Sequence, residues 1–314
     1  MSTSAASLPI HSLRDVFGSS LQENVKLGNY TTARVGGSAA ALLIVHTANE
    51  LADIVQKLWD IEAPYRVLGG GSNVLISDKG LQEVIVINRA NQIKVDAQST
   101  HPTVWAESGA TNVHIGKRLA LRGLSGFAWA TYIPGTLGGA VYGNAGAHGS
   151  EIACKLILAD ILHPVLGKVQ WTAKDFDYGY RSSVLKRSNS KAVILAASLA
   201  LSHSSREKVE KRLETIINRR KKVQPPGSSL GSIFKNPQDD KAGRLIEAVG
   251  LKGTRIGDVE ISQKHANFFV NHGDAQAKDI YALIRLTQKT VEEKFGVALE
   301  MEIELLGDWT EDDE

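Results

Sequence analysis

Apolar residues recur at helical spacing in several parts of the chain. In residues 47–61 they repeat every three or four positions from Leu51 onward, which places them on one face of a helix. Residues 204–222 show the same spacing, and Ser204 with Glu207 predicts a capping box at the start of that helix. The same pattern predicts further helices at residues 113–121, 242–249 and 275–294.

Shorter runs of apolar and β-branched residues lie between these helices and predict strands. In the last run, residues 299–306, Glu300, Glu302 and Glu304 alternate with apolar residues, as on a strand with one solvated face. The mixture of strands and helices predicts an α+β protein, with its main boundary near residues 202–224. The predicted strands are 41–45, two runs within 65–77, 84–88, 103–107, 156–162, 192–201, 265–271 and 299–306.

Two glycine-rich stretches interrupt this pattern. Residues 126–149 hold seven glycines among aromatic and aliphatic residues and carry almost no charge. A flexible linker is usually polar as well as glycine-rich, so a packed loop whose bare backbone approaches a ligand is the better interpretation. Consecutive N–H groups in such a loop can bind a pyrophosphate. Within residues 65–77 a second glycine turn departs from the Rossmann fingerprint, because Val74 stands where the third glycine belongs.

Together, the segments GGGSNVLI and IPGTLGGAVYGNAGAHG resemble the flavin-binding half of the UDP-N-acetylenolpyruvoylglucosamine reductase (MurB) family. The resemblance implies an α+β fold with a two-part FAD-binding domain of the PCMH/vanillyl-alcohol-oxidase-like type, followed by a smaller α+β substrate-binding domain. The chain is shorter than the branch of the family that carries an inserted, tyrosine-bearing substrate loop. The implied division is an N-terminal extension at 1–28, FAD-binding subdomains at 29–90 and 91–202, and a substrate-binding domain at 203–314.

The resemblance also assigns residues to the FAD site. They lie in the two glycine stretches, as the backbone argument expects. The cofactor-binding residues so implied are Gly69, Gly70, Gly71, Ser72, Asn73, Ile133, Pro134, Gly135, Thr136, Gly138, Gly139, Asn144 and Gly146.

Three residues are candidates for catalysis. Read without the resemblance, Ser232 is an ordinary loop serine, Arg181 a surface cation and Glu302 one of the solvated glutamates. In the family, the G-S-x-F-x-N-P motif carries a proton-donating serine, the Y-R-x-S motif a catalytic arginine, and the C-terminal E-V-x-x-x-G motif a catalytic glutamate. The register of these motifs selects Ser232, Arg181 and Glu302 as catalytic and implies Tyr180, Lys235 and Asn236 as substrate-binding.

A competing motif lies just before Ser232. Residues 227–231 match G-x-S-x-G, the nucleophile elbow of α/β-hydrolases. That elbow needs an apolar strand in front of it, whereas Pro225 and Pro226 precede it here. We therefore disfavour a serine hydrolase.

The family uses FAD and NADPH to reduce the enolpyruvyl ether of UDP-N-acetylglucosamine enolpyruvate to UDP-N-acetylmuramate, for peptidoglycan. Reduction leaves negative charge beside a carboxylate, which Arg181 suits. Ser232 then gives a proton, tuned by Lys235, and Glu302 is either an uncharged acid or a partner of Arg181. An FAD-dependent sugar or alcohol oxidase of the same fold and a non-catalytic nucleotide-binding module remain alternatives. Reduction of the bound flavin by NADPH separates the reductase from the oxidase.

Composition limits the remaining choices. The chain has 314 residues and a formal net charge of +2, so no strong field draws it to nucleic acid or membrane. Its single cysteine, Cys154, fits a cytoplasmic protein and is predicted to be a buried, inert thiol. No His, Cys, Asp and Glu set has metal-ligand spacing, so no metal is expected. The expected partner is a small UDP-sugar, and the oligomeric state stays open, with a monomer among the alternatives.

Overall fold

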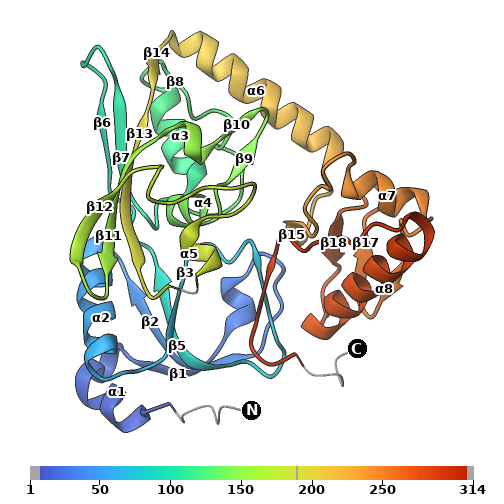
Figure 1. The fold of residues 1–314 in the computed structure, drawn as a ribbon, viewed down its shortest axis with the longest axis horizontal. Coiled ribbons are helices and arrows are strands. Elements are labelled where there is room, and N and C mark those ends of the chain that lie inside the picture. The colour runs from blue at the N-terminus through green and yellow to red at the C-terminus, as the bar shows by residue number, and fades with distance from the viewer. Residues whose placement is uncertain (1–7, 189, 310–314) are drawn as a thin grey trace.

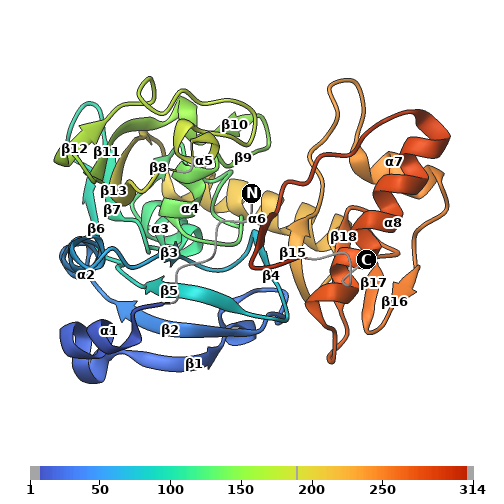
Figure 2. The same ribbon diagram turned by 60° about the horizontal axis from the view of Figure 1, so that its bottom comes forward.

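A computed structural model describes residues 8–188 and 190–309. Within these residues the chain forms three parts, which lie side by side in Figures 1 and 2. The first and second parts are each built on a separate sheet, and the third part lies across from both of them. Helix α6, Arg206–Val223, runs from the second part to the third.

The first part is built on a four-stranded sheet of order β1-β2-β5-β3. Thr47 caps α2, since its Oγ1 accepts from the Glu50 N–H at 3.1 Å. The Glu50 carboxylate accepts from the N–H of His46, one residue before the cap. The elements are α1 Ile10–Phe17, β1 Gln22–Lys26, β2 Ser38–Val45, α2 Ala48–Asp60, β3 Tyr65–Leu68 and β5 Leu81–Asn88.

Strand β1 pairs with β2 in antiparallel register. Residues 22–26 are therefore part of the first sheet and not of a separate extension; residues 1–7 of the segment predicted as an extension lie outside the described residues. Strands β2 and β3 both pair with β5 in parallel, with α2 crossing between them. Parallel strands place their carboxyl ends at one edge, and the glycine turn at residues 69–71 begins at the end of β3.

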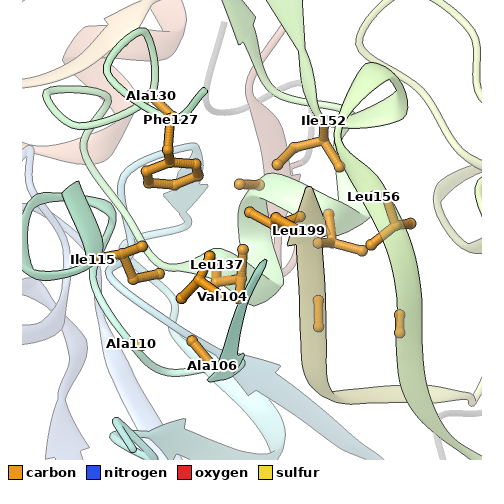
Figure 3. Packing of buried hydrophobic residues seen from close by; sticks show 14 of the residues in the cluster. Val104, Ala106, Ala110, Ile115, Phe127, Ala130, Leu137, Ile152, Leu156 and Leu199 are labelled. Carbon is orange, nitrogen blue, oxygen red and sulfur yellow. The ribbon is translucent and has the colours of Figure 1, made fainter. Parts of the chain in front are cut away.

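The second part surrounds a five-stranded antiparallel sheet of order β12-β11-β13-β7-β6. Its core lies between this sheet and helices α3 and α4, where Phe127, Ile115, Leu137, Val104 and Leu199 pack together (Figure 3). The elements are β6 Ile93–Asp96, β7 Thr103–Glu107, α3 Asn112–Ala120, β8 Leu124–Ser125, α4 Leu137–Tyr142, β9 Gly146–Ala147, β10 Ser150–Glu151, β11 Leu156–His163, β12 Gly167–Trp171, α5 Val184–Arg187, β13 Val193–Ala200 and β14 Ser202–His203.

Two local predictions fail in this region. Cys154 is exposed at the end of a 3₁₀ turn, Ile152–Cys154, because the strand begins only at Leu156; the predicted buried thiol is wrong. Helix α6 begins one residue later than the predicted capping box allows. Its N-cap is Ser205, whose Oγ accepts from the Lys208 N–H at 3.3 Å.

The third part packs two helices against a four-stranded sheet of order β15-β18-β17-β16. Buried Phe234 and Phe269 meet edge to face at its centre, with ring centroids 6.2 Å apart. The elements are β15 Ser228–Ser232, α7 Ala242–Ala248, β16 Arg255–Ile256, β17 Val259–Ile261, β18 Phe268–Asn271 and α8 Ala277–Phe295.

The chain then returns to the glycine turn at residues 69–71. Strand β19, Glu304–Leu306, pairs in parallel with β4, Val74–Ile76, which directly follows that turn. The predicted strand over residues 299–306 is thus too long, and the three glutamates do not share one solvated strand face. This pairing places the end of the third part beside the glycine-rich backbone of the first (Figure 2).

Candidate active site

The two glycine stretches pack against each other. A Cβ added to Gly70 would lie 3.1 Å from the Gly135 Cα, and one added to Gly69 only 2.4 Å from the Thr136 Oγ1. The Ser72 hydroxyl donates to the Pro134 carbonyl at 3.2 Å and joins the two turns. The two stretches to which the resemblance assigns the FAD-binding residues therefore lie side by side.

A large cavity of about 1690 Å³ opens beside these turns. It extends to residues of α6, of β15 and of the segment around Glu302. Pockets for one small ligand are typically about 300–1,000 Å³, so this space suits a cofactor together with a second ligand. The cavity lies where the three parts of the chain meet.

The backbone at the turns suits an anionic cofactor. Among the described residues, the N–H groups of Gly70, Gly71, Ser72 and Gly135 donate to no protein acceptor. Gly71 is buried, and a buried N–H normally has a partner, so its unpaired N–H at the cavity wall fits a phosphate oxygen. The N–H groups of the other three residues are more exposed and are open to the same ligand. Asn112 adds a polar group at the same wall: its Oδ1 is buried and has no partner in the described chain. These features fit FAD, with the pyrophosphate at the turns.

Twelve of the thirteen predicted cofactor-binding residues line the cavity; Asn144 does not. Asn144 is 1% exposed and serves the backbone: its Nδ2 donates to the Gly179 carbonyl, and its Oδ1 accepts from the Ala153 N–H. The amide thus holds two loops together, and the binding of FAD by Asn144 stays a prediction. Those lining the cavity are Gly69, Gly70, Gly71, Ser72, Asn73, Ile133, Pro134, Gly135, Thr136, Gly138, Gly139 and Gly146.

Arg181 and Glu302 meet directly in the cavity. The Arg181 Nε donates to the Glu302 Oε1 at 2.9 Å, and its Nη2 donates to the Gly146 carbonyl at 2.6 Å. A Cβ on Gly146 would lie 2.9 Å from the guanidinium, which explains the glycine. Arg181 also has a φ of 53°, a conformation that costs energy for a residue with a side chain. The fold therefore maintains strain to hold this guanidinium in place.

Ser232 lies at the end of β15 and also lines the cavity. The Glu302 N–H donates to the carbonyl of Ile233, the next residue, at 2.8 Å. On the other side, buried Asn267 accepts from the Phe234 N–H at 2.9 Å and donates to the Phe234 carbonyl at 2.8 Å. The three predicted catalytic residues are thus brought together, and Asn267, which the sequence reading missed, fixes the loop that follows the serine.

Two of the three predicted substrate-binding residues line the cavity, and the third does not. Tyr180 is 51% exposed at the cavity, and the Arg181 guanidinium lies over its ring at 5.0 Å. Asn236 lines the cavity and accepts from the Ala242 N–H through Oδ1, which leaves its NH₂ group for a ligand. Lys235 points elsewhere: its ammonium pairs with Glu300, and it is absent from the described cavity wall. The idea that Lys235 tunes Ser232 is therefore unsupported.

A second ion pair in the cavity was not predicted. Lys186 and Glu304 lie 3.1 Å apart, and both side chains are largely buried. Burial, and then the charge of Glu304, raises the pKa of neighbouring Tyr142 to about 12. The alternation of Glu302 and Glu304 was visible in the sequence, but nothing there indicated that Lys186 would face the second glutamate. Glu302 thus pairs with Arg181, and Glu304 pairs with Lys186.

The structure does not test the expectations that the protein binds no metal and is not drawn to a membrane. Among residues 8–188 and 190–309, no group of three or more His, Cys, Asp or Glu side chains could hold a metal ion. No helix within the same ranges is long and apolar enough to cross a bilayer.

Fold and site together define an FAD-binding oxidoreductase. Residues 39–160 match the family model of an FAD binding domain, and residues 222–306 match that of the UDP-N-acetylenolpyruvoylglucosamine reductase C-terminal domain. The chain belongs to the UDP-N-acetylenolpyruvoylglucosamine reductase family. The two-part FAD-binding fold with an added α+β domain, expected from the sequence, is confirmed.

Relatives match over nearly the whole chain. The reductase of Chloroflexus aggregans is 39% identical over 91% of this chain and 97% of its own length, and that of Chloroflexus aurantiacus 38% over 89% and 95%. Among solved structures, the reductase (MurB) from Thermus caldophilus superposes with a TM-score of 0.76 at 35% identity, covering 90% of this chain and 98% of that one. These matches favour the reductase over an oxidase of similar fold.

Proposed function

We propose that this chain reduces the enolpyruvyl ether of UDP-N-acetylglucosamine enolpyruvate to UDP-N-acetylmuramate with NADPH, and that Arg181, Ser232 and Glu302 carry the reaction. The observation that supports it most is the Arg181–Glu302 contact in a cavity that also holds Ser232 and both glycine turns. The contact joins residues 121 positions apart, and both are side chains that the motifs had selected.

The glycine turns would hold FAD, with the free N–H groups of Gly70 and Gly71 directed at its phosphates. Bound FAD would supply the hydride chemistry, between NADPH and the vinyl carbon of the substrate. The protein's own contribution is position and charge. Asn73 contributes to position, because its Nδ2 donates to the Glu302 carbonyl at 3.0 Å and ties the turn to the catalytic segment.

Arg181 binds the carboxylate of the enolpyruvyl group and stabilises the negative charge that develops beside it. Its Nε and Nη2 are already bonded to protein, which fixes the plane of the guanidinium and leaves further N–H groups for a ligand. Ser232 donates the proton to the α-carbon of the substrate. Of the two roles considered for Glu302, the 2.9 Å contact between the Arg181 Nε and the Glu302 Oε1 supports the role of partner of Arg181.

The substrate implies a setting. Nucleotide-activated sugars and NADPH are cytoplasmic metabolites, and a chain with one cysteine, exposed at Cys154, needs no oxidising compartment. We therefore place the enzyme in the cytoplasm, acting on a UDP-sugar in peptidoglycan precursor synthesis.

Anaerobic absorbance spectroscopy of the purified holoprotein tests the proposal. NADPH is expected to bleach the flavin bands, and UDP-N-acetylglucosamine enolpyruvate is expected to restore them with formation of UDP-N-acetylmuramate. A flavin that ignores NADPH but is bleached by an alcohol or a free sugar would show an oxidase instead. A protein that binds FAD but changes its spectrum with neither would be a nucleotide-binding module.

A further inference from the structure

Thr32 is bonded to two segments that are far apart in the sequence. Its N–H donates to the carbonyl of Gly71, in the glycine turn at residues 69–71, at 3.0 Å. Its hydroxyl donates to the carbonyl of Ser229 in β15 at 2.7 Å, across 197 positions of sequence. Ser232 lies three residues further along the same strand. One residue therefore connects the turn assigned to FAD with the strand that carries the proposed proton donor.

The segment that carries Thr32 is fixed against the turn. A Cβ on Gly71 would lie 2.1 Å from the Tyr30 carbonyl oxygen, so the turn and this segment are in close contact. Thr31, directly before Thr32, is buried, and its hydroxyl donates to the Val35 carbonyl at 2.9 Å. These contacts hold the backbone on both sides of Thr32, so that its hydroxyl has a defined place relative to the turn.

Strand β15 is irregular close to Ser232. It lies at the edge of its sheet, and β18 is its one partner among the described strands. The register of the two strands shifts between Ser229 and Ser232, and Gly231 within this interval has a φ of 76°. Such irregularities bend a strand and redirect its side chains. The Thr32 hydroxyl contacts β15 at Ser229, the last paired residue before the shift.

The residue after Thr32 holds the partner strand by a different bond. Asn271 of β18 pairs with Ser228 in register, and its Nδ2 donates to the Ala33 carbonyl at 2.9 Å. This second bond is made to the backbone of Ala33, so it does not depend on the side chain of Thr32. The Thr32 hydroxyl can therefore be removed while β18 stays attached to the first part.

We propose that Thr32 is a positioning residue, whose hydroxyl sets the place of β15, and through it that of the Ser232 hydroxyl, relative to the glycine turn. The inference rests on the proposed function for the role of Ser232 as the proton donor. Thr32 acts through the strand, since the donor of its side chain is already bonded to Ser229.

The test compares Thr32→Val with Thr32→Ser. Valine has the shape of threonine but no hydroxyl, so it loses the bond to Ser229 and keeps the backbone bond to Gly71, whereas serine keeps both. Amide hydrogen exchange of the FAD-loaded protein in residues 228–232 is expected to be about 10-fold faster in T32V and normal in T32S. This measurement needs no turnover, so equal exchange in both variants would overturn the inference whether or not the proposed function holds.

Stopped-flow absorbance measures the consequence for the reaction. In T32V, NADPH should bleach the flavin at the normal rate, while reoxidation at saturating enolpyruvyl substrate should slow about 10-fold with an unchanged KM, because small displacements of a reacting group are costly. The solvent deuterium isotope effect on reoxidation should rise, since proton delivery from Ser232 then limits the rate. A raised KM with a normal rate at saturation would make Thr32 a substrate contact instead and overturn the inference.

Asp78→Ala is the control for a general loosening between the first and third parts. The Asp78 carboxylate accepts from the N–H groups of Ala277 and Lys278, at 3.0 and 2.9 Å. These residues begin α8, which contributes nothing to the described cavity wall. D78A should lower the urea midpoint yet leave reoxidation and its isotope effect unchanged; a slowing equal to that of T32V would assign the effect to loose packing and not to Thr32.

The two measurements also separate this inference from the proposed function. An unaltered protein that NADPH bleaches but the enolpyruvyl substrate does not reoxidise would refute the proposed function. Faster exchange of residues 228–232 in T32V would still show that the Thr32 hydroxyl holds β15. Conversely, normal turnover in the unaltered protein, with reoxidation equally fast in T32V and T32S, would leave the proposed function standing and refute the role of Thr32.

Discussion

The Nε of Arg181 donates to the Oε1 of Glu302 at 2.9 Å, and so a strained loop of the second part binds the segment that leads into the last strand. Because the Glu302 N–H also bonds the Ile233 carbonyl, the carboxylate is held from its own backbone. A fixed carboxylate in turn orients the guanidinium. Electrostatic stabilisation depends on such orientation before the charge develops.

Removing this carboxylate should impair catalysis more than binding. Glu302→Ala frees the Arg181 guanidinium to rotate, so we expect kcat to fall by at least about 10²-fold, the loss typical of one misplaced donor to a developing anion. Glu302→Gln keeps an acceptor at the same place and should be less severe. Glu300→Gln is the control, because Glu300 is 73% exposed. Normal turnover in E302A would show that Arg181 needs no partner.

Ser232→Ala should separate the two halves of the reaction. NADPH is expected to bleach the flavin normally, while reoxidation by the enolpyruvyl substrate slows by about 10²–10⁴-fold, the usual worth of a positioned proton donor. Stopped-flow absorbance measures each half. Ser228→Ala, on the same strand but outside the described cavity wall, serves as the control. An unchanged reoxidation rate would remove Ser232 from proton transfer.

Short motifs located the site better than they described its contacts. The glycine turns could be predicted because bare backbone next to apolar residues has few structural uses other than close approach to a ligand. Arg181, Ser232 and Glu302 were found from motif register. The pairing of Lys235 with Glu300 could not be predicted, because the two residues are 65 positions apart in the sequence; its predicted substrate contact stays a prediction. The parallel pairing of β19 with β4 could not be predicted either, because the two strands lie far apart in the sequence. This pairing decides where Glu304 points.

Asn267 should matter for stability as well as for rate. It is 3% exposed and makes both of its side-chain hydrogen bonds to the backbone of Phe234. Asn267→Ala leaves two buried backbone groups unpaired, so the free energy of unfolding should fall by about 2 kcal/mol or more. Urea unfolding measures this loss. Asn236→Ala is the comparison, since its one backbone contact is longer, at 3.2 Å, and a loss as large as that of N267A would contradict the argument.

Acidification should weaken the fold through His265. Burial, the largest cause, lowers the pKa of His265 below its ordinary value, with its ring 4.8 Å from that of Phe268. The imidazole stays neutral in the folded protein but takes up a proton in the unfolded chain as the pH falls through about 6.5. Stability should therefore decline from pH 7.5 to 5.5, and the decline should be shallower in His265→Gln. Urea midpoints at both pH values measure this, with the exposed His101→Gln as control; equal slopes in all three proteins would exclude His265.

The glycine turn offers the sharpest test of the cofactor site. Gly71 has a φ of 56°, and a Cβ there would lie 2.1 Å from the Tyr30 carbonyl oxygen. Gly71→Ala must therefore displace the backbone whose N–H groups face the cavity, and we expect the purified protein to lose its bound FAD. Gly167 has a similar φ of 69° but nothing within 4 Å, so Gly167→Ala should cost only the left-handed backbone penalty of about 1–2 kcal/mol. Absorbance of the purified variants measures the flavin content. Both substitutions place a side chain at a positive φ, but only G71A also clashes with neighbouring backbone. Full flavin content in G71A would therefore mean that the turn does not hold the cofactor.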